Sequence, residues 1–116
     1  MGWDIRLENP DGTRPQVDRH QAGSTIMIGG STEAWMNLTY NYSPYYYTYF
    51  PEDKGLKWLN DKPAGATIEM MQTVLDKLGD APSDNYWESS AGNAGHALGI
   101  LISWARQHPT AVWRLS

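Results

Sequence analysis

Apolar and polar residues alternate along residues 1–50 with the period of two that β-strands show. Trp3, Ile5 and Leu7 would share one face of a strand over residues 3–8. The Asn-Pro-Asp-Gly sequence at residues 9–12 predicts a tight turn, because proline presets φ and glycine accepts positive φ.

Two weaker strands are predicted next. Residues 16–18 form a short candidate strand, and Pro15 beside it indicates an edge position, because proline cannot donate to a strand ladder. Residues 24–28 are partly β-branched, and Gly29-Gly30 suits the tight turn of a hairpin.

The clearest alternation covers residues 34–42. One predicted face carries Ala34, Met36, Leu38, Tyr40 and Tyr42. The opposite face carries Trp35, Asn37, Thr39 and Asn41. Such a strand is covered on its apolar side only, so we expect the Trp-Asn-Thr-Asn face to line a ligand site or an interface.

The second half of the chain changes to a helical period. A single helical turn is predicted over residues 55–60. A helix over residues 67–78 would end at Gly79, a residue suited to stop it. Its apolar stripe consists of Ile68, Met71, Val74, Leu75 and Leu78.

A longer helix is predicted over residues 93–108, because Pro109 forbids its continuation. Gly95 and Gly99 lie one turn apart beside its apolar stripe, where small residues would let another backbone or a ligand approach closely. Residues 110–115 predict a short final strand. The wide apolar stripe makes this the central helix: Ala94, Ala97, Leu98, Leu101, Ile102 and Ala105.

Together these elements predict a single α+β domain over residues 1–116. We expect an antiparallel sheet of about four to five strands with two main α-helices packed on one face. Charged residues make up 19% of the chain and hydrophobic residues 41%, which is typical of folded rather than disordered sequences.

Composition also narrows the partners. No apolar run approaches the about 20 residues of a membrane span, and residues 1–4 show no signal-peptide pattern, so we expect no membrane partner. The chain has no cysteine, which excludes thiolate chemistry and fits a cytoplasmic location. A net charge of −4 argues against duplex nucleic acid, whereas a small anionic ligand needs only a few local donors.

The most aromatic segment is TYNYSPYYYTYF, residues 39–50, called the tyrosine run below. It holds six of the seven tyrosines and the only phenylalanine. Tyrosine offers a broad apolar ring with a polar tip and is enriched at recognition surfaces. Two interpretations stay open: the rings fill a small core, or they bind a ligand or partner.

A second constellation is YWESSAGNAGH, residues 86–96. Backbone N–H groups at a glycine-rich helix start suit phosphate or carboxylate binding, and Tyr86 and Trp87 just upstream could stack a base. The alternative is an ordinary helix start, capped by Asn93 or Ser90.

No catalytic constellation is convincing. Among the three histidines, only His96 is attractive as a general acid or ligand donor. A metal site built from Asp18, His20 and His96 is conceivable but has no recognised spacing. We expect neither a metal nor a cofactor, and we favour a protein without enzymatic activity.

A series of short motifs runs through the chain: Gly29-Gly30-Ser31-Thr32-Glu33, Asn37-Leu38-Thr39-Tyr40-Asn41-Tyr42, Tyr86-Trp87, Gly92-Asn93-Ala94, His108-Pro109 and Val112-Trp113. This series resembles a group of small phage- and prophage-encoded proteins of unknown function. The resemblance covers roughly residues 29–114 and brings no established catalytic residues. This chain differs by its very short connection between the tyrosine run and the next helix.

The resemblance implies three classes of function. The first is a sponge that sequesters a host immune nucleotide signal, such as a cyclic nucleotide or an ADP-ribose derivative, in the cytoplasm of an infected bacterial host. The second is a phage accessory protein that binds another protein through its tyrosines. The third is an enzyme that cleaves such a nucleotide with His96 as acid or base.

For a bound nucleotide, we expect a site between the tyrosine run and the start of the central helix. There Tyr40, Tyr42 and Trp87 would stack on the ligand, and the N–H groups around residues 93–95 would hold a phosphate. The wealth of aromatic rings also predicts a homo-oligomer, a dimer or higher. The expected site residues are Trp35, Asn37, Tyr40, Asn41, Tyr42, Tyr46, Trp87, Asn93, Gly95 and His96.

Overall fold

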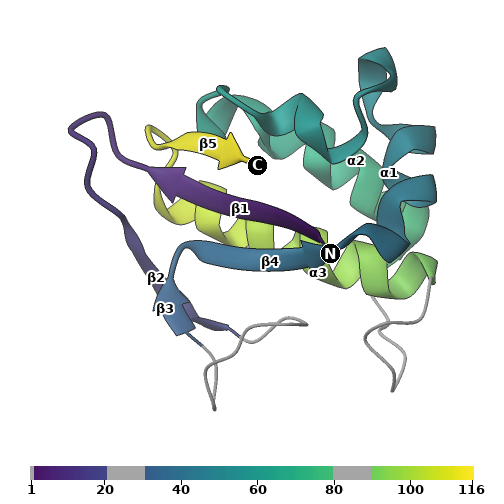
Figure 1. The fold of residues 1–116 in the computed structure, drawn as a ribbon, viewed down its shortest axis with the longest axis horizontal. Helices are drawn as coiled ribbons and strands as arrows, with labels where there is room; N and C mark the ends of the chain where they lie inside the picture. Colours follow the sequence, from purple (N-terminus) through teal and green to yellow (C-terminus); the bar gives the residue numbers. More distant parts are fainter. Residues whose placement is uncertain (1, 21–30, 80–89) are drawn as a thin grey trace.

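The structure combines a three-stranded antiparallel sheet, a separate two-stranded sheet and three α-helices (Figure 1). The computed structural model describes residues 2–20, 31–79 and 90–116. Its strands are β1 (Gly2–Glu8), β2 (Gln16–His20), β3 (Ser31–Glu33), β4 (Trp35–Thr39) and β5 (Val112–Leu115). Its helices are α1 (Ser43–Tyr49), α2 (Ile68–Leu78) and α3 (Ala91–Gln107). The predicted α+β class is confirmed.

The main sheet has the strand order β4-β1-β5, so it is smaller than the four to five strands that we predicted. β2 pairs with β3 instead. Only Ala34, at a bend, separates β3 from β4. At this bend the pairing partner of the chain changes, because β3 pairs with β2 and β4 pairs with β1. The predicted strand over residues 24–28 and the Gly29-Gly30 turn lie outside the described residues.

Beside β5, an irregular segment takes the place of a further strand. The Asp61 N–H donates to the Trp113 carbonyl at 2.9 Å, and the Trp113 N–H donates to the Lys62 carbonyl at 3.1 Å. An isolated antiparallel bridge joins Pro63 to Val112. Proline has no N–H, so this segment satisfies the edge of β5 without forming a regular strand.

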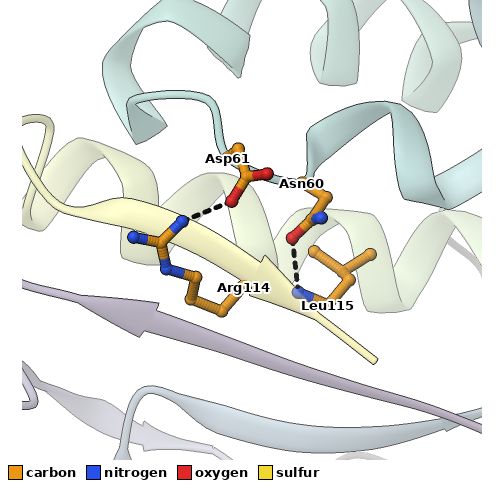
Figure 2. A network of polar contacts seen from close by, with 4 residues as sticks. All are labelled: Asn60, Asp61, Arg114 and Leu115. Carbon is orange, nitrogen blue, oxygen red and sulfur yellow. Dashed lines mark hydrogen bonds and ion pairs between the residues drawn. The ribbon is translucent and has the colours of Figure 1, made fainter.

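Side chains reinforce the same edge (Figure 2). The Leu115 N–H donates to Asn60 Oδ1 at 3.0 Å, and Arg114 forms an ion pair with Asp61. Deeper in the core, Trp113 Nε1–H donates to Thr67 Oγ1 at 2.8 Å. These contacts fix β5 against residues 60–67 although about 50 residues separate them in sequence.

The predicted turn after β1 is confirmed. Gly12 has a φ of 88° and donates its N–H to the Asn9 carbonyl at 2.8 Å. The Asp11 carboxylate accepts from the hydroxyl and the N–H of Thr13, and these hydrogen bonds lower the pKa of Asp11 below its ordinary value of 3.8. These hydrogen bonds therefore stabilise the turn fully at pH values above 3.8, and this stabilisation is lost as the pH falls through the lowered pKa of Asp11.

The strand that we extended to residue 42 ends at Thr39, so this part of the prediction is wrong. Thr39 Oγ1 accepts from the Asn41 N–H at 3.2 Å and caps a 3₁₀ turn, Tyr40–Tyr42. Pro44 then occupies the first turn of α1, where a missing N–H costs nothing. Local capping and proline chemistry thus override the alternation, and the tyrosine run is mainly helical.

The other helices follow their predicted stripes. α2 buries Met71, Val74 and Leu78 and ends at Gly79, whose φ is 76°. A 3₁₀ segment, Gly55–Leu59, matches the predicted single turn.

α3 is the central helix, and it starts two residues earlier than predicted because Ser90 caps it. In Figure 1 it lies behind the main sheet, and its buried residues belong to the same core cluster as those of β1 and β4. Within the described ranges, no helix combines the length and the apolar content needed to cross a bilayer.

Gly95 lies where the start of α3 meets the end of α2. A Cβ atom on Gly95 would stand 1.6 Å from the carbonyl oxygen of Gly79 and 3.2 Å from Leu75 Cδ1. Gly95 therefore does allow a close approach, and the group that approaches is the backbone of α2. By contrast, no atom of the described residues lies within 4 Å of a Cβ on Gly99.

The two glycines predict opposite effects of one substitution. Gly95→Ala should lower the free energy of unfolding by about 2 kcal/mol or more, because the two helices must separate. Gly99→Ala should raise it by up to about 1 kcal/mol, because alanine favours helix. Urea unfolding followed by circular dichroism measures both values, and equal stability of the two variants would contradict the close packing at Gly95.

Candidate functional site

The tyrosine run contains buried rings, exposed rings and one half-buried ring, Tyr45. Tyr42 and Tyr46 are 0% exposed and Phe50 is 3% exposed, at a spacing of four residues. The exposed rings, which we call the exposed tyrosines, are Tyr40 (41%), Tyr47 (48%) and Tyr49 (38%). The core-filling interpretation is therefore confirmed for the buried rings, and binding of a ligand or partner stays a prediction for the exposed ones. The four-residue spacing of the buried set was the available signal for a helix.

The tyrosine run does meet the start of α3, as expected. Tyr46 Oη donates to the Ala94 carbonyl at 2.9 Å in the core. However, the contact is direct, and the rings of Tyr42 and Tyr46 are fully buried. Neither ring can stack on a ligand in this conformation.

The start of α3 is occupied by its own cap. Ser90 Oγ accepts from the Asn93 N–H at 3.1 Å, and the Ser90 carbonyl accepts from the Ala94 N–H at 3.2 Å. Two of the amides that we expected to hold a phosphate are therefore used, and Gly95 is covered by α2. His96 is exposed, and Trp87 lies outside the described residues.

Two other expected site residues, Trp35 and Asn37, lie on the face of the main sheet that points away from α3, which we call the open face. Residues of β1 alternate here: Trp3, Ile5 and Leu7 enter the core, whereas Asp4, Arg6 and Glu8 are half-buried. In Figure 1 no described helix lies in front of this face. The open face consists of Asp4, Arg6 and Glu8 from β1, Trp35 and Asn37 from β4, and Val112 and Arg114 from β5.

Strand register sorts these side chains into rows. Arg6 lies directly opposite Trp35 in β4 and opposite Arg114 in β5. In the next row, Asp4 faces Asn37, whose Nδ2 donates to Asp4 Oδ1 at 3.0 Å. An aromatic ring, a guanidinium and an amide–carboxylate pair are therefore neighbours on one surface.

Hydrogen bonding shows which of these pairs are closest. The Leu7 N–H donates to the Ala34 carbonyl at 3.0 Å, so the adjacent pair Arg6 and Trp35 is not hydrogen-bonded. In such pairs the Cα atoms are about 4.5 Å apart and the side chains are closest. The indole of Trp35 and the stem of Arg6 are thus adjacent.

The two arginines of the row differ in charge compensation. Arg114 forms an ion pair with Asp61 and reaches toward the segment beside β5 (Figure 2). Across residues 2–20, 31–79 and 90–116, no hydrogen bond or ion pair engages the Arg6 guanidinium. Arg6 is therefore the available cation of the open face.

The structure brings Trp35 and Asn37 together on the open face. The other expected residues that it describes lie on the 3₁₀ turn, α1 and α3: Tyr40, Asn41, Tyr42, Tyr46, Asn93, Gly95 and His96. Thr39 is 2% exposed, and Asn41 lies beyond the strand end in the 3₁₀ turn. Sequence analysis missed Arg6 and Arg114. The alternation of the first strand placed Arg6 outward, but its pairing with Trp35 depends on a register that no local pattern reveals.

A hollow of about 270 Å³ lies at the end of α2 and is lined by Gln72, Leu75, Asp76 and Gly79. Gln72 Nε2 donates to Asp76 Oδ1 at 2.9 Å. A carboxylate beside the negative end of a helix disfavours anions, so this hollow is a poor nucleotide site. Over the described part of the chain, no three His, Asp or Glu side chains gather as metal ligands would.

The division of the tyrosine run predicts different costs for removing a hydroxyl. Tyr46→Phe should lower the free energy of unfolding by about 1 kcal/mol, because a buried hydrogen bond to Ala94 is lost. Tyr47→Phe should change it by less than about 0.5 kcal/mol, because that ring is exposed. Denaturant unfolding of both variants tests this, and a Tyr47 effect as large as that of Tyr46 would contradict it.

Comparison of the chain with protein-family models, with curated proteins and with solved structures gave no match. The functional argument therefore starts from the geometry of the open face and of the exposed tyrosines.

Proposed function

We propose that the protein is a binding module that captures a small anionic, nucleotide-like ligand on the open face of its sheet. The observation that carries this proposal is the cross-strand neighbourhood of Trp35 and Arg6, next to the Asp4–Asn37 pair. An aromatic ring stacks on a base, and a guanidinium binds a phosphate oxygen. The proposed site differs from the one expected between the tyrosine run and α3, because a direct, buried contact fills that space.

The resemblance to phage proteins supplies the biological context of the proposal. In that context the ligand is a host immune nucleotide, and the protein sequesters it without cleaving it. A flat sheet face covers less of a ligand than a concave site does. A second copy of the chain would provide the missing cover, which is in line with the expected homo-oligomer.

A panel of cyclic nucleotides and ADP-ribose derivatives tests the proposal by thermal shift. Trp35→Ala should weaken binding of any ligand found by about 5- to 150-fold, which corresponds to the about 1–3 kcal/mol of a stacked base. Tyr49→Ala is the matched control, because it removes an exposed ring from α1, which is not part of the open face. Equal binding by both variants and the parent would contradict the proposal.

Recovery of the ligand after heat denaturation separates capture from catalysis. An intact ligand supports sequestration. A cleaved ligand would support the enzyme hypothesis instead. Because His96 lies on α3, from which the open face points away, loss of cleavage in His96→Ala would place the site at the start of α3 and contradict capture on the open face.

The exposed tyrosines favour a second candidate, recognition of another protein. Their rings are exposed yet held: Tyr40 packs edge-on against Trp3 at 4.9 Å, and Lys77 Nζ lies 5.5 Å from the ring centre of Tyr49. Residues 34–51 contain no charged side chain. Held aromatic rings on a segment without charged side chains suit a protein partner, because little entropy is lost on binding.

For this candidate, the double variant Tyr47→Ala/Tyr49→Ala should abolish capture of a host protein in pull-downs from bacterial lysate. Trp35→Ala should leave such capture intact, so each variant serves as the experimental control for the other surface. A partner lost with Trp35 and retained without the tyrosines would contradict this candidate.

A further inference from the structure

Arg6 stands at the centre of the open face between unlike neighbours. Across the ladder it meets Trp35 on one side and Arg114 on the other. The mutual hydrogen bonds between Asp4 and Ser116, at 2.9 and 3.0 Å, place Arg6 and Arg114 in the next hydrogen-bonded pair of the same ladder. Like charges directly opposite each other destabilise a sheet, so an anion beside Arg6 would relieve this strain.

Asp61 already neutralises one of the two arginines. Its ion pair draws the Arg114 guanidinium toward the segment beside β5, on the side away from β1 (Figure 2). Arg6 is therefore the only guanidinium of the row that a ligand can reach without breaking an existing ion pair.

Two carboxylates bracket Arg6 along β1. Asp4 and Glu8 lie two residues before and after it, on the same face and about 7 Å away along the strand. Asn37 holds Asp4, and in the described ranges neither carboxylate reaches ion-pair distance of Arg6. Together with Asp61, three carboxylates therefore lie near the two guanidiniums of Arg6 and Arg114.

From this charge arrangement we infer that the open face selects a singly charged phosphodiester group, held by Arg6, over a terminal phosphate with two charges. The inference rests on the proposed function, since it concerns the ligand of the same face. The ligand class is a nucleotide whose ring stacks on Trp35 and whose phosphate is cyclic or bridging.

The physical reason is the balance of near charges. A phosphodiester carries one negative charge, which Arg6 compensates. A terminal phosphate carries about −1.5 to −2 at pH 7, because its second pKa is about 6. The additional charge has no second free guanidinium and meets Asp4 and Glu8 on both sides, so it weakens binding.

Calorimetric titration of the full chain with cyclic AMP, AMP and adenosine tests the inference. At pH 7, cyclic AMP should bind at least about threefold more tightly than AMP. At about pH 5, where AMP carries one charge, the difference should disappear. A merely structural role of Arg6 would not produce this pH dependence.

Charge-removing variants provide the second arm. Arg6→Gln should weaken cyclic AMP binding about tenfold, as loss of a charged hydrogen bond does. Arg106→Gln, in the last turn of α3, is its control and should have no effect. Glu8→Gln should strengthen AMP binding more than cyclic AMP binding, whereas the exposed Glu69→Gln should change neither.

The outcomes separate this inference from the proposed function. If the nucleotides bind through Trp35 but Arg6→Gln changes nothing, or AMP binds as tightly as cyclic AMP at pH 7, the inference is overturned and nucleotide capture stands. If no nucleotide binds but dimethyl phosphate shifts the Arg6 NMR signals and not those of Arg106, the anion site is supported and nucleotide capture is overturned. If neither set of signals moves, both fail.

Discussion

The alternation of β1 is the constraint on which the rest of the structure depends. β1 is the central strand of the main sheet, so its residues are hydrogen-bonded on both sides. Its odd positions, among them Ile5 and Leu7, form the floor of the core, and its even positions form the open face. A shift of one residue would exchange the two sets, so the core that fixes the register also fixes the position of Arg6.

The contacts that anchor β5 have a second consequence for the open face. Trp113 holds the strand through its indole and its main chain, and both groups bond to residues 61–67. The ion pair between Arg114 and Asp61 lies on the exposed edge of the same junction. An exposed pair of this kind adds little stability. Its larger effect is to orient Arg114 away from Arg6, so an edge contact determines the charge presented beside Trp35.

Sequence patterns predicted what depends on neighbours along the chain. The first strand, the turn at residues 9–12 and the stripe of α2 follow from period and turn chemistry, and all three are confirmed. Residues 40–42 were assigned to a strand because they continue the alternation of residues 34–39. The cap at Thr39 and the helix start at Pro44 each act on only a few residues, so the alternation hid their effect. The neighbourhood of Arg6 and Trp35 joins residues 29 positions apart in sequence. It became visible only once register was known.

Gly95 shows how a residue suited to a ligand can be required by the fold. A glycine in the first turn of a helix resembles an anion site, and the same absence of a side chain permits the 1.6 Å approach of the Gly79 carbonyl to its Cβ position. Because the end of α2 fills that space, α3 cannot also admit a phosphate there. The space at Gly95 is closed by packing, and the side of the sheet away from α3 keeps its polar groups half-exposed. The two groups that the proposed ligand would need, a stacking ring and a cation, therefore both lie on the open face.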